Sequence, residues 1–201
     1  LSRIFPFLKN KMELIEACRV GNIDMVQSLV LQQGANIQDG DIYGLTPLMH
    51  AAGFGHTIVV QFLLARGAHL ERRDAEGLTS LAHAVLSKHV DVIRLLVESG
   101  ADVGVFDNET LRSPLTIAIN EQENLNTEIV RLLVKPGANI NSADINGRTP
   151  LILATSLENV EIVRLLLDAG ANPNILDNEN QTALDYAVLS NHDGLILLLE
   201  D

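Results

Sequence analysis

The sequence predicts an all-α fold in which pairs of short helices repeat along the chain, stack in layers and are joined by β-hairpin loops. The first observation is an aspartate that recurs with steps of 33, 33, 37 and 33 residues, at positions 41, 74, 107, 144 and 177. The second is a Gly-x-Thr-x-Leu motif at 44–48, 77–81 and 147–151, with Asn in place of Gly at 180–184. The third is a Gly-Ala pair at 34–35, 67–68, 100–101, 137–138 and 170–171. A fixed period of about 20–50 residues is typical of stacked-repeat proteins.

Residues 41–73 show how one repeat is expected to fold. Asp41 and Gly44 are typical of a tight turn, and Thr46 is expected to cap a first helix that has Pro47 at its first position. A second helix is predicted from the i, i+3, i+4 spacing of the apolar residues at 58, 59, 62, 63 and 64. Gly67 fits the position just after a helix, where the backbone is often left-handed. The unit is therefore a turn, a helix, a second turn, a second helix and a hairpin.

We expect a single domain over residues 1–201 that is built from copies of this unit. The predicted repeats are an N-terminal one at 8–40, which lacks the opening turn motif, full repeats at 41–73, 74–106, 107–143 and 144–176, and a partial repeat at 177–201. A single unit leaves the apolar faces of its helices exposed. Stacking buries them, and each fully buried Leu or Ile contributes about 1.5–3 kcal/mol.

The repeat at 107–143 differs from the others. Thr110 replaces the turn glycine, one extra residue precedes Ser113, and three more lie in the acidic segment 120–126. One interpretation is that this longer loop between the two helices contacts a partner. The other is that it is a tolerated insertion, because lengthening a surface loop costs little closure entropy.

Composition limits the partners that the protein could have. The formal net charge is -12 and the isoelectric point is about 4.8, so the phosphates of nucleic acids and anionic membranes are repelled. A basic or mixed-charge protein is the expected partner. Cys18 is the one cysteine of the chain, which excludes an internal disulfide and is compatible with a reducing compartment. We expect an intracellular, cytoplasmic location, with the nucleus, or the host cytosol for a secreted effector, as alternatives.

No motif in the chain predicts catalysis, a metal or a cofactor. His50 and His83 lie 33 residues apart, in adjacent layers about 10 Å from one another, which is too far for shared zinc ligation. His56, His89 and His192 recur at the start of second helices and are expected to make local hydrogen bonds. Gly-rich phosphate loops, His-Glu-x-x-His and Gly-x-Ser-x-Gly do not occur in the sequence. We therefore predict no enzymatic activity.

The repeat resembles that of the ankyrin repeat family over residues 8–201. The resemblance depends on Asp-x-x-Gly-x-Thr-Pro-Leu at 41–48 and 144–151, and on Ile-Val-Arg-Leu-Leu followed by Gly-Ala-Asn at 129–139 and 162–172. The histidine that follows Thr-Pro-Leu in the family is replaced here by Met49, Ala82, Thr116, Ile152 and Asp185. In animal members, the positions of Asn141 and Asn174 can be hydroxylated. The resemblance implies a solenoid of helix-turn-helix units that binds proteins through its hairpin tips and the concave face of its first helices.

Transferred by position, this implies a set of candidate partner-binding residues: Ile42, Tyr43, Leu45, Phe54, Ala75, Glu76, Leu78, Asn108, Glu109, Arg112, Ile145, Asn146 and Arg148. Five of them are expected to form an apolar patch across the second and third layers: Ile42, Tyr43, Leu45, Phe54 and Leu78. The alternative is that Leu45 and Leu78 tuck partly into the adjacent turn. Clustered apolar and aromatic side chains at a surface are typical of interaction sites.

The favoured function is a non-enzymatic scaffold for protein–protein interaction. The alternative is a targeting or substrate-recruitment module of a larger enzyme or of a secreted bacterial effector. Leu197 is apolar at a position where the complete repeats are polar. Because a terminal repeat is expected to be polar on its outer side, further repeats or self-association at this end are additional hypotheses.

Overall fold

The computed structural model describes residues 4–120, 127–134 and 138–200, and within these ranges the chain forms helices and turns but no strand. Contacts between residues divide the chain into two compact units, Leu1–Asp102 and Val103–Asp201. Each unit is described by itself below, and the expectation of a single domain over 1–201 stays a prediction.

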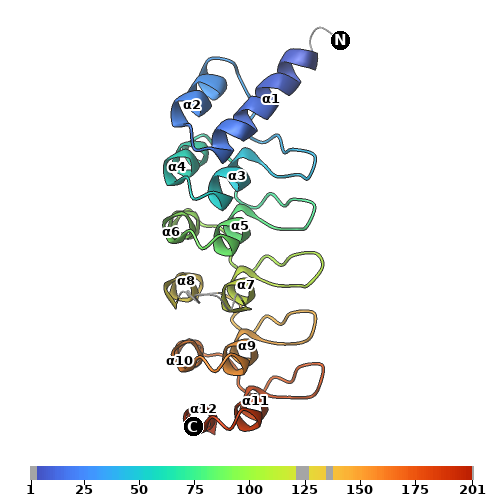
Figure 1. The fold of residues 1–201 in the computed structure, drawn as a ribbon, viewed down its shortest axis with the longest axis vertical. Helices are drawn as coiled ribbons and strands as arrows, with labels where there is room; N and C mark the ends of the chain where they lie inside the picture. The colour runs from blue at the N-terminus through green and yellow to red at the C-terminus, as the bar shows by residue number, and fades with distance from the viewer. Residues whose placement is uncertain (1–3, 121–126, 135–137, 201) are drawn as a thin grey trace. The chain divides into compact units, whose positions relative to one another are not determined.

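The first unit contains three helix pairs: α1 (Ile4–Arg19) with α2 (Ile23–Leu31), α3 (Pro47–Gly53) with α4 (Thr57–Ala65), and α5 (Ser80–Leu86) with α6 (Val90–Glu98). The first helices α1, α3 and α5 contact one another in succession, and so do the second helices α2, α4 and α6 (Figure 1). The long helix α1 has 16 residues, whereas α3 and α5 have 7 each. It begins before residue 8, where the first repeat was expected to start.

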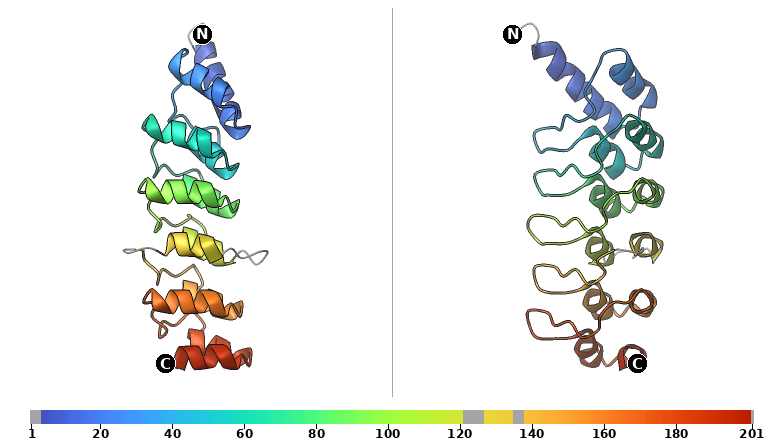
Figure 2. Two further views of the ribbon diagram at one scale, coloured as in Figure 1. Left: turned by 90° about the vertical axis from the view of Figure 1, so that its left-hand side faces the viewer. Right: turned by 180° about the vertical axis from the view of Figure 1, so that it is seen from behind.

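The second unit repeats this arrangement with α7 (Pro114–Asn120) and α8 (Thr127–Leu133), α9 (Pro150–Ser156) and α10 (Val160–Asp168), and α11 (Ala183–Leu189) and α12 (Asp193–Glu200). Again the first helices contact first helices and the second helices contact second helices (Figure 2). The predicted all-α architecture of stacked helix pairs is confirmed. Most of the acidic insertion at 120–126 lies outside the described residues, so both interpretations of it stay open.

The first helix of a repeat starts where its hydroxyl residue accepts a hydrogen bond. Thr46 Oγ1 accepts from the amide of Met49 at 3.3 Å, and the corresponding threonines of three later repeats do the same, namely Thr79, Thr149 and Thr182. In the repeat that lacks this threonine, Ser113 Oγ accepts from the amide of Thr116 at 3.3 Å. Side-chain caps of this kind satisfy amide groups that have no partner within the helix.

In two repeats, the residue that stands at the position of the family histidine makes a hydrogen bond back to the cap residue. The carboxylate of Asp185 accepts from the backbone amide of Thr182 at 2.7 Å, and the sulfur of Met49 accepts from the amide of Thr46 at 3.2 Å. A charged acceptor makes the stronger bond. The cap residue and the third residue of the helix therefore bond to one another in both directions in these two repeats.

The core is a series of thin apolar layers between neighbouring helix pairs. Small residues on α3, such as Ala51 and Ala52, are completely buried and allow α1 and α5 to approach closely. Branched residues of the second helices, such as Val60 and Leu63 on α4, are also completely buried. Cys18 lies in the same core, where burial raises the pKa of its thiol to about 12, so it stays protonated.

We predict that Leu63→Ala lowers the free energy of unfolding by about 2–5 kcal/mol, because it leaves a cavity between layers. Ile58→Ala on the same helix is the control, since the Ile58 side chain is 68% exposed and should cost less than about 0.5 kcal/mol. Urea denaturation followed by circular dichroism measures both. Equal losses in the two variants would contradict the assignment of the core.

Candidate binding surface

In each repeat from the second onward, the loop before the first helix is built around one aspartate. Asp41 Oδ1 accepts from the amides of Tyr43 and Leu45 at 2.9 and 3.0 Å. The same pair of bonds recurs in the loops of Asp74, Asp144 and Asp177. Asp107, whose repeat lacks the turn glycine, binds the amide and the hydroxyl of Thr110 instead, each at 2.6 Å. The carboxylate thus holds the loop in one conformation and turns its tip toward solvent.

In the first unit, a histidine of the following helix binds the second oxygen of this aspartate. His50 Nε2 donates to Asp41 Oδ2 at 3.0 Å, and His83 Nε2 donates to Asp74 Oδ2 at 2.7 Å. Both histidines are nine residues after their aspartate. They connect the loop to α3 and α5, and this role explains why they recur 33 residues apart.

In the second unit, tyrosine and arginine side chains bind the second oxygen of the loop aspartate. Tyr186 Oη donates to Asp177 Oδ2 at 2.7 Å, from the position that corresponds to the histidines. Arg148 and Arg112 donate to Asp144 Oδ2 and Asp107 Oδ2 at 2.9 and 3.3 Å. Both arginines were predicted to contact a partner, and the structure shows them half-buried and bound to the aspartates of their own loops.

The charge of these aspartates is favoured by their partners. Burial alone would raise the pKa of Asp41, but the hydrogen bonds from His50 and from the amides of Leu45 and Tyr43 outweigh it and lower the pKa. The pKa values of Asp107 and Asp177 are lowered in the same way, against burial, by the bonds from Thr110 and Tyr186 respectively. Asp41, Asp107 and Asp177 therefore remain ionised acceptors at neutral pH.

The loop tips lie side by side within each unit and are exposed. Ile42 and Tyr43 are 90% and 64% exposed, although the carbonyl of Tyr43 accepts from the amide of Ala75 in the next loop at 2.9 Å. In the second unit, the amides of Ile145 and Asn178 bond in the same way to Thr110 and Asn146. These backbone bonds join neighbouring loops into a row, with no strand assigned among the described residues. The other predicted tip residues at the surface are Ala75, Glu76, Asn108, Glu109, Ile145 and Asn146.

Two leucines of the predicted apolar patch are less exposed than its other members, in line with the alternative that they tuck into the turn. Leu78 is only 7% exposed, and Leu45 is half-buried. The cause is the turn itself, because the bonds from Asp74 to the amides of Glu76 and Leu78 direct the fourth residue after the aspartate inward. We therefore withdraw Leu78 from the candidate surface and keep Ile42 and Tyr43.

Phe54 is also kept, since half of its side chain is exposed at the end of α3. Its other half is supported by its neighbours. The Arg19 guanidinium lies 5.7 Å from the ring centroid, and the His56 ring stacks beside it at 6.4 Å. His56 itself donates to the carbonyl of Arg19 at 2.9 Å, and His89 likewise reaches Gly53 at 3.1 Å. These two histidines connect adjacent repeats, so their hydrogen bonds are not local in the sequence, contrary to the prediction.

Within the residues described, no group of three His, Cys, Asp or Glu side chains is arranged to hold a metal ion. None of the helices in that part of the chain combines the length and apolar character of a membrane span.

A family model described as ankyrin repeats in three copies matches residues 14–107 and 115–201. The chain belongs to the ankyrin repeat family. Among solved structures, it is similar to a chain from the complex of the predatory endopeptidase Bd0816 from Bdellovibrio bacteriovorus with immunity protein Bd3460. The two chains are 28% identical with a TM-score of 0.81, and the match covers 94% of this chain and 96% of that chain. Ankyrin repeats typically serve as non-enzymatic modules that bind other proteins.

Two features of this ankyrin-repeat chain were not predicted from its sequence. The first is the second partner of Asp41, Asp74 and Asp177, which the constant spacing of nine residues to His50, His83 and Tyr186 could have predicted. The second is a groove on the first repeat, around Met12 and Met25. No signal pointed to it, because that repeat lacks the turn motif by which positions were transferred.

We predict that Tyr186 ionises near pH 12 rather than near the ordinary value of 10.0. Its hydrogen bond to the Asp177 carboxylate raises its pKa first, and burial and the charges of Asp177 and Glu179 add to the shift. Since the neutral phenol is favoured in the folded state, Tyr186 stabilises the fold below pH 10 and loses that contribution as the pH rises toward 12.

Tyrosinate absorbance after rapid mixing to high pH measures this shift in a Tyr43→Phe variant, where Tyr186 is the one remaining tyrosine. Adding Asp177→Asn, which keeps an acceptor oxygen for the turn, should move the midpoint back toward 10. Midpoints near 10 in both proteins would show that the hydrogen bond has no such effect.

Proposed function

We propose that this chain is a non-enzymatic scaffold that captures a partner protein through its loop tips and the adjoining ends of its first helices. The observation that carries the proposal is the pair Ile42 and Tyr43, which stand exposed on a loop that Asp41 and His50 hold in place. Large apolar side chains are usually buried. Their exposure on a loop that hydrogen bonds hold in one conformation is typical of a contact surface.

The hydrogen bonds that hold this loop are also expected to increase its affinity for a partner protein. A loop that is ordered before binding loses less conformational entropy when it docks. The bonds of Asp41 to two amides and to His50, and the bond between the Tyr43 carbonyl and the next loop, fix the tip in advance. A tyrosine in such a position offers a large contact area with few rotatable bonds.

Charge supports a particular kind of partner. With a formal net charge of -12, the chain would attract a basic or mixed-charge protein and speed its association. We propose an intracellular setting for this encounter. The alternative role, as the targeting or recruitment module of a larger enzyme or a secreted effector, uses the same surface and differs in what is joined to it.

We predict that Tyr43→Ala combined with Phe54→Ala weakens partner capture at least about tenfold, because aromatic side chains at such positions often contribute 2 kcal/mol or more. Capture by immobilised protein from a lysate, followed by mass spectrometry and a binding titration with the captured protein, measures this. Folding should be nearly intact, since both side chains are at least half exposed.

Ile58→Ala serves as the matched control, because it removes an equally exposed apolar side chain from α4, away from the loop tips. It should bind like the unmodified protein. Unfolding of the double variant would mean that the two aromatics belong to the core. Unchanged capture by a folded double variant would refute the assignment of the surface.

A second candidate is that the partner is an endopeptidase. The similarity to a chain from an endopeptidase–immunity protein complex, at 28% identity over nearly the whole of both chains, favours it. In that case the captured protein should hydrolyse a fluorogenic casein substrate, and an excess of this chain should slow the hydrolysis. A captured protein without peptidase activity would exclude this candidate and leave the scaffold role in place.

A further inference from the structure

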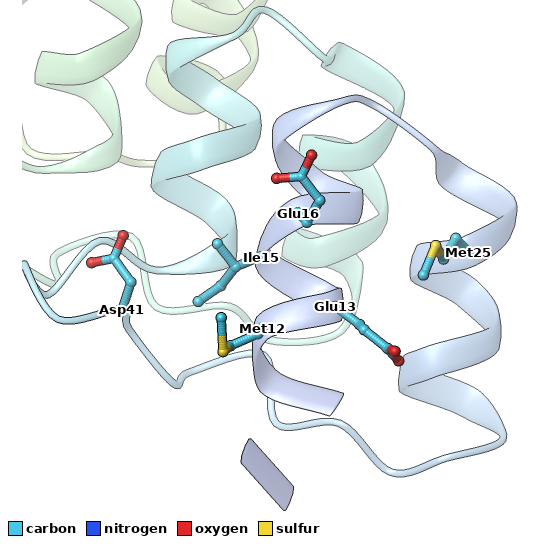
Figure 3. Close-up of a pocket in the computed structure, with 6 residues that line it drawn as sticks. All are labelled: Met12, Glu13, Ile15, Glu16, Met25 and Asp41. Carbon is cyan, nitrogen blue, oxygen red and sulfur yellow. The ribbon is translucent and has the colours of Figure 1, made fainter. Parts of the chain in front are cut away.

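The first repeat carries a groove that the loop tips do not account for. Its volume is about 460 Å³, and it is lined by residues of α1, α2 and the first loop: Met12, Glu13, Ile15, Glu16, Met25 and Asp41. Met12 and Ile15 extend toward the loop of Asp41, whereas Glu13 points toward α2, which carries Met25 (Figure 3). Volumes of about 300–1,000 Å³ are usual for sites that accept a ligand group.

The apolar part of this groove is unusually open to water. Met12 and Met25 are 70% and 41% exposed, and two further exposed apolar residues, Val20 and Leu31, lie on or next to the same two helices. Methionine is flexible and polarizable, so a methionine-lined surface can adapt to side chains of different shape. Covering it would remove apolar surface from water, which favours a partner with a bulky apolar side chain.

The polar part of the groove is acidic, because three carboxylates line it and no basic side chain does. Basic groups lie at its edge: Lys9 Nζ is 3.7 Å from Glu13, and Arg19 binds Glu16 at 2.7 Å. His50 binds Asp41 on the side of α3. In the pair of Lys9 and Glu13, the Lys9 side chain is 73% exposed and the Glu13 side chain 35%, and an ion pair with one exposed partner is weak in water. The Arg19 hydrogen bond lowers the pKa of Glu16, which keeps this carboxylate charged at neutral pH.

The groove adjoins the surface proposed above. Asp41 lines the groove, and the next two residues along the chain are the exposed tip residues Ile42 and Tyr43. A partner that contacts this tip therefore has only a short distance to cover before it reaches α1. Helix α1 begins earlier than α3 and α5, and Met12 lies in this additional part, whereas Glu13, Ile15 and Glu16 lie in the part of α1 that corresponds to α3.

We propose that the groove of the first repeat docks a basic segment of the partner protein, with a bulky apolar side chain against Met12 and Met25 and a lysine or arginine against Glu13 and Glu16. This inference rests on the proposed function as a protein-binding module and adds a second contact with its own chemistry. Apolar contact provides affinity, and the carboxylates select a cationic segment over an acidic one.

The test uses two fluorescein-labelled amphipathic peptides of leucine with either arginine or glutamate, and fluorescence anisotropy measures their binding to the full chain. The arginine peptide should bind and the glutamate peptide should not. Met12→Ser with Met25→Ser should weaken binding at least about tenfold. Glu13→Gln with Glu16→Gln should weaken it and also reduce its dependence on salt.

A charge-matched control separates the groove from general attraction to an acidic protein. Asp91→Asn with Glu98→Gln removes the same charge from exposed positions of α6 in the same unit and should leave binding within about twofold. Equal weakening by the control pair and the groove pair, or no binding of the arginine peptide, would overturn the inference. Circular dichroism and thermal melts confirm that each variant is folded.

Failure of this inference and failure of the proposed function have different signatures. If Tyr43→Ala with Phe54→Ala abolishes capture of the natural partner while both groove pairs leave capture and peptide binding unchanged, the groove is not a docking site and the scaffold role stands. If the groove pairs weaken peptide binding and also capture of the natural partner, the inference is supported. If the chain captures no protein, the proposed function itself is refuted.

Discussion

The bonds of one aspartate per repeat organise the surface of this protein. In the loops of Asp41, Asp74, Asp144 and Asp177, the first oxygen accepts from two backbone amides, and the second oxygen binds a side chain of the helix that follows or of the loop itself. Backbone amides need hydrogen-bond partners. Here the carboxylate accepts from loop amides that are not paired in a β-ladder. Everything exposed at the tips, including Ile42 and Tyr43, depends on this carboxylate remaining ionised and bound.

The second constraint is that each repeat buries its apolar faces only against its neighbours. Within each compact unit the first helices pack on first helices and the second on second helices, through small residues such as Ala51 and branched ones such as Leu63. Histidines also connect neighbouring repeats, since His56 and His89 each donate a hydrogen bond to a carbonyl of the preceding repeat. Because the inner layers are completed in this way, the loops and helix ends can carry exposed aromatic and methionine side chains without loss of the core.

Local signals explain why much of the fold could be predicted. The threonine caps, Pro47 and the 33-residue period each act over a few residues or repeat in register, and the structure confirms the helix pairs that they indicated. The exposure of single side chains was harder to predict. Leu78, a candidate surface residue, is buried, and the candidates Arg112 and Arg148 are half-buried and bind aspartates of their own loops. These outcomes depend on which neighbour a side chain reaches, and spacing along the chain does not show that.

The sequence by itself determined the architecture, because period, caps and apolar spacing are properties of neighbouring residues. The tertiary structure alone decided which side chains face solvent and which surfaces are continuous. It brought Met12, Met25 and Asp41 to one groove although they lie on two helices and a loop, and it turned Leu78 inward. The physical reason is that exposure depends on contacts between elements, and those contacts exist only once the layers have packed.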